Sequence, residues 1–163
     1  MGVIYEELGL FQEGLESLHK ALRLNPNHLE TLLQLGRFYS NMKNYQESII
    51  YLDKLLKLAP NYTEIGLLFG KNLVKLNQFE KALPHLEKAI KKEPSSFDAQ
   101  FYLGITLTHL NRPEDAISPL QKATKIKPDS SLTFNQLGQT YQKLKMFPEA
   151  INSYKEAIRI EPN

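Results

Sequence analysis

Residues Pro128–Asn163 read PDSSLTFNQLGQTYQKLKMFPEAINSYKEAIRIEPN, and this stretch decides the fold. Its apolar residues return every three or four positions, which is the spacing of one face of a helix. They fall into two groups, so the stretch predicts two successive helices. The first group is Leu137, Tyr141 and Leu144, and the second is Phe147, Ile151, Tyr154 and Ile158.

The same pattern recurs along the whole chain with a period of 34 residues. Prolines stand at Pro26, Pro60, Pro94, Pro128 and Pro162, and glycines stand at Gly2, Gly36, Gly70, Gly104 and Gly138. A glycine inside a helix costs about 1 kcal/mol relative to alanine, so its return in every unit predicts a close approach between two helices. Proline cannot continue the preceding helix, and the residue after it favours a helix N-cap. We therefore expect first helices to start at Asn27, Asn61, Ser95, Asp129 and Asn163.

This combination resembles the tetratricopeptide repeat (TPR) family, whose repeat has Leu-Gly and Tyr in the first helix, Ala in the second and Pro at the end. The motif stands as Leu35-Gly36 with Tyr39, Phe69-Gly70 with Leu73, Leu103-Gly104 with Leu107, and Leu137-Gly138 with Tyr141. The resemblance implies an all-α fold, a right-handed superhelical solenoid of stacked antiparallel helix pairs. Second helices are expected to begin near Phe11, Tyr45, Phe79, Pro113 and Phe147.

We expect a single TPR array over residues 1–163. Its repeats are approximately residues 1–28, 29–62, 63–96, 97–130 and 131–163, and the first is truncated because Gly2 already occupies the glycine position. No polar helix follows Pro162, although solenoids usually need a terminal cap. We therefore expect exposed apolar surface around Ile158 and Ile160, and a chain that is either an excerpt of a longer array or covered by another copy or domain.

Composition argues against several classes of partner. The net charge of +2, from 20 Lys and Arg against 18 Asp and Glu, is too balanced to indicate nucleic acid or a charged membrane surface. The absence of cysteine excludes disulfides, thiolate metal sites and a Cys nucleophile. Because no apolar run approaches the roughly 18 residues of a membrane span, we expect no membrane insertion and a cytoplasmic protein.

The residues also offer little for catalysis. The four histidines, at His19, His28, His85 and His109, have no paired ligand spacing, and the glycines follow the repeat rather than a phosphate loop. The sequence thus predicts no metal, no cofactor and no enzyme activity. A basic column late in the second helices is either a docking strip for an acidic partner or the usual preference of cations for helix C-termini. Its members are Lys20, Arg23, Lys54, Lys57, Lys88, Lys91, Lys122 and Lys125.

The resemblance implies that first helices line a concave groove that holds peptides. The positions that correspond to the groove are Leu33, Gln34, Arg37, Leu67, Leu68, Lys71, Phe101, Tyr102, Ile105, Asn135, Gln136 and Gln139. The apolar members lie off the face that packs the helix pair, so they predict an exposed apolar patch beside amides that can bond a peptide backbone. Alternatively, some of them pack against the neighbouring repeat.

The sequence therefore predicts a protein–protein interaction module that binds a peptide or helix of a partner, as part of a larger scaffold or assembly protein. The Lys-Asn-Asn-Lys-Arg set with which co-chaperone members clamp a carboxylate is mismatched here, for example at Leu67 and Phe101. Two alternatives stay open. One is a substrate-recruiting arm of an enzyme whose catalytic domain lies outside the chain, and the other is a homo-oligomer formed through the uncapped ends.

Overall fold

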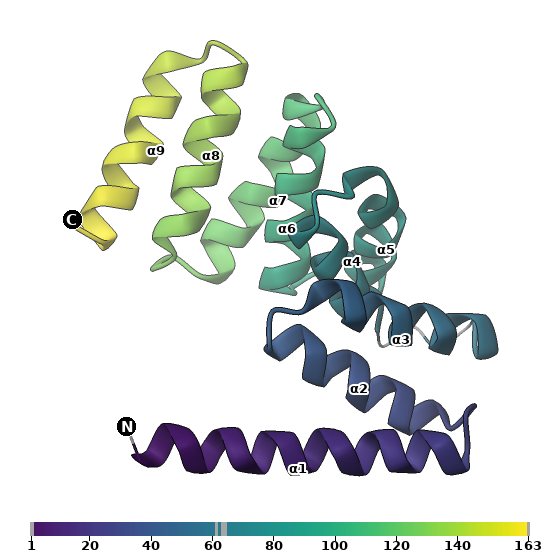
Figure 1. The fold of residues 1–163 in the computed structure, drawn as a ribbon. Helices are drawn as coiled ribbons and strands as arrows, with labels where there is room; N and C mark the ends of the chain where they lie inside the picture. Colours follow the sequence, from purple (N-terminus) through teal and green to yellow (C-terminus); the bar gives the residue numbers. More distant parts are fainter. Residues whose placement is uncertain (1, 61, 63–64, 163) are drawn as a thin grey trace. The chain divides into compact units, whose positions relative to one another are not determined.

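The computed structural model describes residues 2–60, 62 and 65–162, with side chains described from residue 12 onward (Figure 1). Within those ranges the regular structure consists of nine helices and no strand, which confirms the all-α prediction. The helices are α1 (Gly2–Leu24), α2 (Leu29–Asn41), α3 (Tyr45–Leu58), α4 (Gly66–Lys75), α5 (Phe79–Lys92), α6 (Phe97–His109), α7 (Pro113–Ile126), α8 (Ser131–Lys143) and α9 (Phe147–Ile160).

Internal contacts divide the chain into two compact units, Met1–Leu68 and Phe69–Asn163. In the first unit, α2 packs against both α1 and α3. In the second unit, α6 pairs with α7 and α8 pairs with α9, and these pairs lie side by side in Figure 1. Stacking of α5 on α6 and of α7 on α8 joins successive pairs. The second unit is therefore held together by contacts between sequence neighbours, as in a solenoid.

The start of the second helices is predicted correctly in four repeats and wrongly in the first. Helices α3, α5, α7 and α9 begin at the expected residues, whereas α1 runs without a break through Phe11. An unbroken helix pairs the backbone groups of that stretch within α1, so no turn is made there.

The turn inside each complete pair depends on one residue in the left-handed region. These residues are Lys43, Asn77, Asn111 and Lys145, with φ between 57° and 60°. The amide that follows each one bonds back into the first helix, as Met146 N–H does to the Tyr141 carbonyl at 2.9 Å. This is the 6→1 bond of a Schellman motif, which satisfies a carbonyl at the helix end.

The first helices begin one residue later than predicted. The N-caps are His28, Ser96 and Ser130, whose side chains accept from the amides of Thr31, Ala99 and Thr133. The reason is a β-turn across the repeating proline, in which Ser96 N–H bonds to the Glu93 carbonyl at 3.1 Å. The proline takes the second position of that turn and the residue after it takes the third, so the helix starts after both. The predicted caps at Asn61 and Asn163 lie outside the described residues.

The repeating glycines sit where the two helices of a pair approach most closely. A β-carbon at Gly70 would lie 2.8 Å from Leu86 Cγ, and one at Gly138 would lie 2.7 Å from the Tyr154 ring. At Gly36 and Gly104 the obstructing side chains are Leu52 and Leu120. Both leucines are fully buried. The predicted close approach is confirmed, and a bulky residue of the second helix fills the space that each glycine leaves.

We expect Ala123→Leu to lower the free energy of unfolding by about 1–3 kcal/mol, because overpacking a filled core forces strain into its neighbours. Ala123 is 0% exposed in α7. Ala157→Leu is the matched control, since Ala157 holds the same place in α9 and is only partly buried. Urea melts of both variants test this, and equal midpoints would contradict tight packing at Ala123.

We expect Lys145→Gly to raise the free energy of unfolding by about 1 kcal/mol. A side chain at φ 60° costs roughly that much, and glycine removes the clash. Lys155→Gly should have the opposite effect, because Lys155 is an exposed residue inside α9, where glycine costs about 1 kcal/mol. Thermal melts measure both changes, and a destabilised Lys145→Gly variant would show that the turn is not strained.

Candidate functional site

The predicted groove residues of the first unit have unequal access to solvent. Leu33 is 3% exposed and belongs to the core, so it packs as the alternative interpretation expects. Gln34 is half-buried, and its amide donates to the Glu30 carboxylate at 2.6 Å. Arg37 is exposed on the same helix. In this unit α2 therefore presents polar groups rather than an apolar patch.

Near the unit boundary, Leu67 and Leu68 at the start of α4 are each half-buried. Both therefore keep some accessible apolar surface.

In the second unit, α6 carries an aromatic group whose members differ in burial. Phe101 stacks on Phe97 with ring centroids 5.8 Å apart and meets the edge of Tyr102 at 5.4 Å. Tyr102 is 8% exposed and offers little surface, whereas Phe101 and Ile105 are half-buried. Phe101 and Ile105 are thus the members of this group that another molecule can reach.

Two lysines of α4 cover the Tyr102 ring. The ammonium nitrogens of Lys71 and Lys75 lie 5.6 and 5.8 Å from its centroid, within cation–π range. Lys71 also stands 3.9 Å from the Asp98 carboxylate, at the outer limit of an ion pair. Lys75 was not among the predicted groove residues. Its place four residues after Lys71 is the signal that could have found it, since side chains at that spacing are neighbours on a helix.

The amides on α8 form the next part of the surface. Asn135 and Gln139 are both exposed, and the Gln139 amide lies 3.5 Å from Asn135 Oδ1. Gln136 differs, because its Nε2 atom is buried and has no hydrogen-bond partner among the described residues. A buried donor without a partner costs about 1–3 kcal/mol. Because this atom is closed off from solvent, its missing bond is a cost within the fold and not a contact that a ligand can reach.

The same region of α8 is joined to α6 by polar contacts. The hydroxyls of Thr108 and Thr140 lie 3.0 Å apart, and Lys143 Nζ donates to the Thr108 carbonyl at 2.9 Å. Both threonines are buried. These bonds fix the spacing of α6 and α8, and so hold Phe101 and Ile105 in place relative to the amides.

Two histidines of the second unit are held towards their neutral form. His85 packs on Phe69 with centroids 4.6 Å apart, and burial followed by the Lys88 charge lowers its pKa. His109 stacks on Phe79 at 4.3 Å, and its pKa is lowered by burial and then by Lys143. Across the described part of the chain, no group of three or more His, Cys, Asp or Glu could hold a metal ion.

None of the helices in the described ranges combines the length and the apolar character that crossing a membrane requires.

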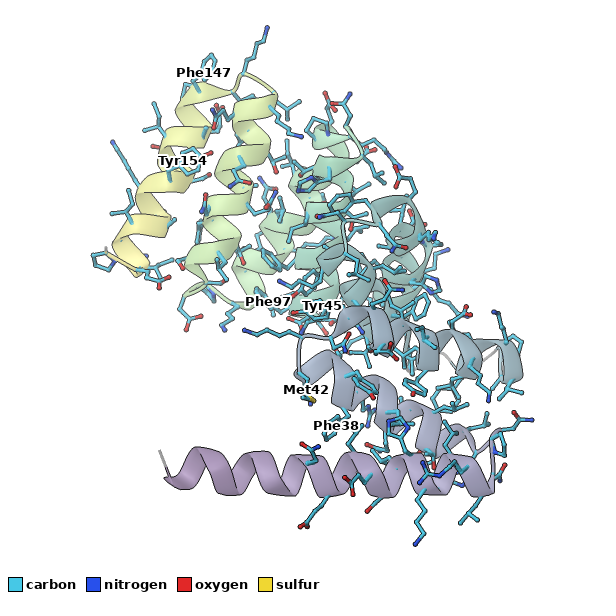
Figure 2. The ribbon with its side chains drawn as sticks, in the orientation of Figure 1. Phe38, Met42, Tyr45, Phe97, Phe147 and Tyr154 are labelled. Atoms are coloured by element: carbon cyan, nitrogen blue, oxygen red, sulfur yellow. The ribbon has the colours of Figure 1, made fainter. Side chains whose placement is uncertain are left out.

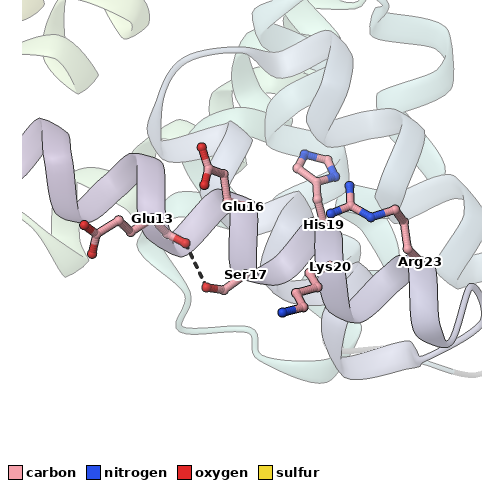
Figure 3. Close-up of a pocket in the computed structure, with 6 residues that line it drawn as sticks. All are labelled: Glu13, Glu16, Ser17, His19, Lys20 and Arg23. Atoms are coloured by element: carbon pink, nitrogen blue, oxygen red, sulfur yellow. Dashed lines mark hydrogen bonds between the residues drawn. The ribbon is translucent and has the colours of Figure 1, made fainter.

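One hollow of about 590 Å³ lies along α1 in the first unit (Figure 3). All of its lining residues belong to that single helix, and they are Glu13, Glu16, Ser17, His19, Lys20 and Arg23. The Ser17 hydroxyl donates to the Glu13 carbonyl at 2.8 Å. With two carboxylates and two cations on one open side, this hollow is a solvated helix face rather than an enclosed site.

A second hollow, of about 330 Å³, lies on the face of the last repeat. Its lining includes Leu132, Tyr154 and Ile158, and Figure 2 labels Phe147 and Tyr154 on α9. The apolar side chains there are largely exposed, with 68% for Leu132, 57% for Phe147, 52% for Ile151 and 62% for Ile158. The prediction for Ile158 is therefore confirmed, whereas Ile160 is half-buried.

Three family profiles described as tetratricopeptide repeat match the chain, over residues 7–71, 67–131 and 131–163. Among solved structures, MamA 41-end from Desulfovibrio magneticus RS-1 has 28% identity and a TM-score of 0.85, and the match covers 95% of this chain and 88% of that one. Another crystal structure of MamA has 25% identity and a TM-score of 0.81, covering 99% and 94%.

A third similar structure is YrrB, described as a TPR protein with an unusual peptide-binding site. It has 24% identity and a TM-score of 0.84, covering 98% of this chain and 82% of that one, and it bears on the fold alone. No curated protein gives a significant match to the sequence.

We expect the free energy of unfolding to fall as the pH drops below about 6.5. The folded state lowers the pKa of both His85 and His109, so their stabilising contribution is complete above the unfolded pKa and is lost as the pH falls through the folded value. The double variant His85→Phe, His109→Phe should show a shallower decline. Urea unfolding between pH 8 and 5 measures the slopes, and an unchanged slope would contradict the assignment.

Proposed function

We propose that this chain, which belongs to the tetratricopeptide repeat family, is a protein-interaction module that holds a peptide or helix of a partner protein. The binding surface is the inner wall, by which we mean Phe101, Ile105, Asn135, Gln136 and Gln139 on α6 and α8. In this function the chain contributes binding rather than catalysis, as part of a larger scaffold or assembly protein.

The observation that carries the proposal is the pair of exposed amides on α8, Asn135 and Gln139. Each amide can donate to a peptide carbonyl and accept from a peptide N–H. The inner wall therefore offers hydrogen bonds suited to a main chain rather than to one side chain.

Apolar anchoring would come from Phe101 and Ile105. Phe101 is already held between Phe97 and Tyr102, so little side-chain freedom is lost when a ligand packs on it. Buried aromatic anchors commonly contribute about 2 kcal/mol or more to a protein interface. An apolar contact flanked by amides supports a peptide ligand with at least one large apolar residue.

Self-association is the second candidate, and the exposed face of the last repeat favours it. Leu132, Phe147, Ile151 and Ile158 are all more than half exposed, and two of them, Leu132 and Ile158, line a hollow. Soluble proteins seldom leave contiguous apolar patches of this kind uncovered. If a second copy covers this face, the apparent mass of the protein depends on its concentration.

We expect Phe101→Ala to weaken peptide binding about 30-fold, which corresponds to about 2 kcal/mol. The probes are 12-residue peptides selected from a displayed random library on the intact chain, with affinities measured by calorimetry. Phe147→Ala is the matched control, because it removes an exposed phenylalanine from α9 outside the inner wall. Thermal melts confirm that each variant is folded.

Sedimentation of the parent and of Ile158→Lys separates the second candidate from the first. The groove proposal predicts peptide binding that Ile158→Lys leaves unchanged. The proposal is wrong if Phe101→Ala binds as tightly as the parent while Ile158→Lys abolishes a concentration-dependent increase in mass.

A further inference from the structure

The cations above Tyr102 suggest what the partner of the inner wall is like. Lys71 and Lys75 are like charges four residues apart on α4, a spacing that slightly destabilises a helix. Both ammonium groups lie within 6 Å of one ring centroid, so they converge on the same region. This arrangement concentrates positive charge beside Phe101, whose ring meets the Tyr102 edge.

The charge is only weakly balanced within the chain. Asp98 stands 3.9 Å from Lys71, and the two side chains are 47% and 36% exposed, so the pair contributes little. Among the described residues, Lys75 makes no ion pair with a carboxylate. A third lysine of the first helices in this unit, Lys143, lies on α8. Its charge contributes to the lowered pKa of His109. These helices therefore carry three lysines against one aspartate.

We infer that the segment bound on the inner wall is an acidic peptide, with an Asp or Glu side chain held between Lys71 and Lys75. This inference rests on the proposed function, because it names the partner of the same surface. The carboxylate would accept charge-assisted hydrogen bonds from both ammonium groups, which are stronger than neutral ones. The apolar residue that packs on Phe101 and Ile105 would then lie next to the acidic one.

The position of Tyr102 strengthens this recognition. Its ring is 8% exposed and lies beneath both lysines, so it shields their inner side from water. Charges act more strongly on each other where water is partly excluded. A carboxylate in this place would be recognised better than by lysines on an open helix face such as Lys122 and Lys125, which are exposed on α7.

The surroundings favour a peptide over a nucleic acid. A nucleic acid backbone needs a track of cations spaced along it, with stacking surfaces for the bases. Here the cations form one cluster rather than a track, and the exposed amides of Asn135 and Gln139 on α8 suit a peptide main chain. A peptide with one acidic side chain next to an apolar one matches a single lysine cluster next to Phe101.

The experiment uses the peptides selected on the intact chain from the displayed random library. We expect enrichment of Asp or Glu beside a large apolar residue, with affinity that falls as salt is raised. The double variant Lys71→Gln, Lys75→Gln should weaken binding of the selected peptide about tenfold. The matched control Lys122→Gln, Lys125→Gln, which also removes two charges, should leave the affinity unchanged.

A charge exchange keeps the test valid if the double variant is destabilised. Lys75→Glu alters one exposed side chain, and it should bind a peptide whose acidic residue is replaced by lysine better than the parent does. If Phe101→Ala abolishes peptide binding while the lysine variants retain it, the peptide binds on the inner wall but Lys71 and Lys75 do not recognise an acidic residue. If neither Phe101→Ala nor the lysine variants weaken binding, the peptide does not bind on the inner wall. If a 12-nucleotide poly-dT displaces the selected peptide as well as the unlabelled peptide does, the site recognises anions in general rather than peptides.

Discussion

The approach of a helix backbone to a bulky side chain at Gly36, Gly70, Gly104 and Gly138 is the contact on which the rest of the fold depends. Leu52, Leu86, Leu120 and Tyr154 each occupy space that a β-carbon would need. This contact fixes the distance between the helices of a pair, and the shared core of α6 to α9 forms around it, with Leu120 and Ala116 buried between Leu107 and Tyr141. The close crossing therefore determines where the first-helix faces lie.

The spacing of apolar residues predicted the helical fold because it shows which residues are buried on one face of each helix. It located the starts of α3, α5, α7 and α9 correctly, since the first apolar residue or proline of each helix marks its beginning. It misplaced the N-caps because residue preference alone cannot tell Ser95 from Ser96. The deciding factor is the β-turn bond from Ser96 N–H to the Glu93 carbonyl, which fixes the third turn position. The uninterrupted α1 was missed because the repeat pattern predicts a turn in every unit, whereas an unbroken helix pairs the same backbone groups within itself.

The accessibility of several predicted groove residues follows from helical spacing, which tells which residues share a face. Phe101 and Ile105 are accessible as expected, and Asn135 and Gln139 are exposed. Spacing does not tell how far a neighbouring helix covers that face, so the burial of Tyr102 beneath the long side chains of α4 could not be seen. Lysine stems can cover apolar surface while their charges remain in water. For the same reason Lys75, which gives the site part of its charge, was overlooked.

Contacts between successive pairs, such as α5 with α6 and α7 with α8, have a consequence for how such a chain can change over evolution. In the second unit, α5 and α7 each present a surface that the first helix of the next pair fits. A gene duplication that copies one 34-residue segment brings both halves of this fit with it. The chain can therefore lengthen by whole units without a new interface, while substitutions on the exposed faces of α6 or α8 leave those contacts unchanged.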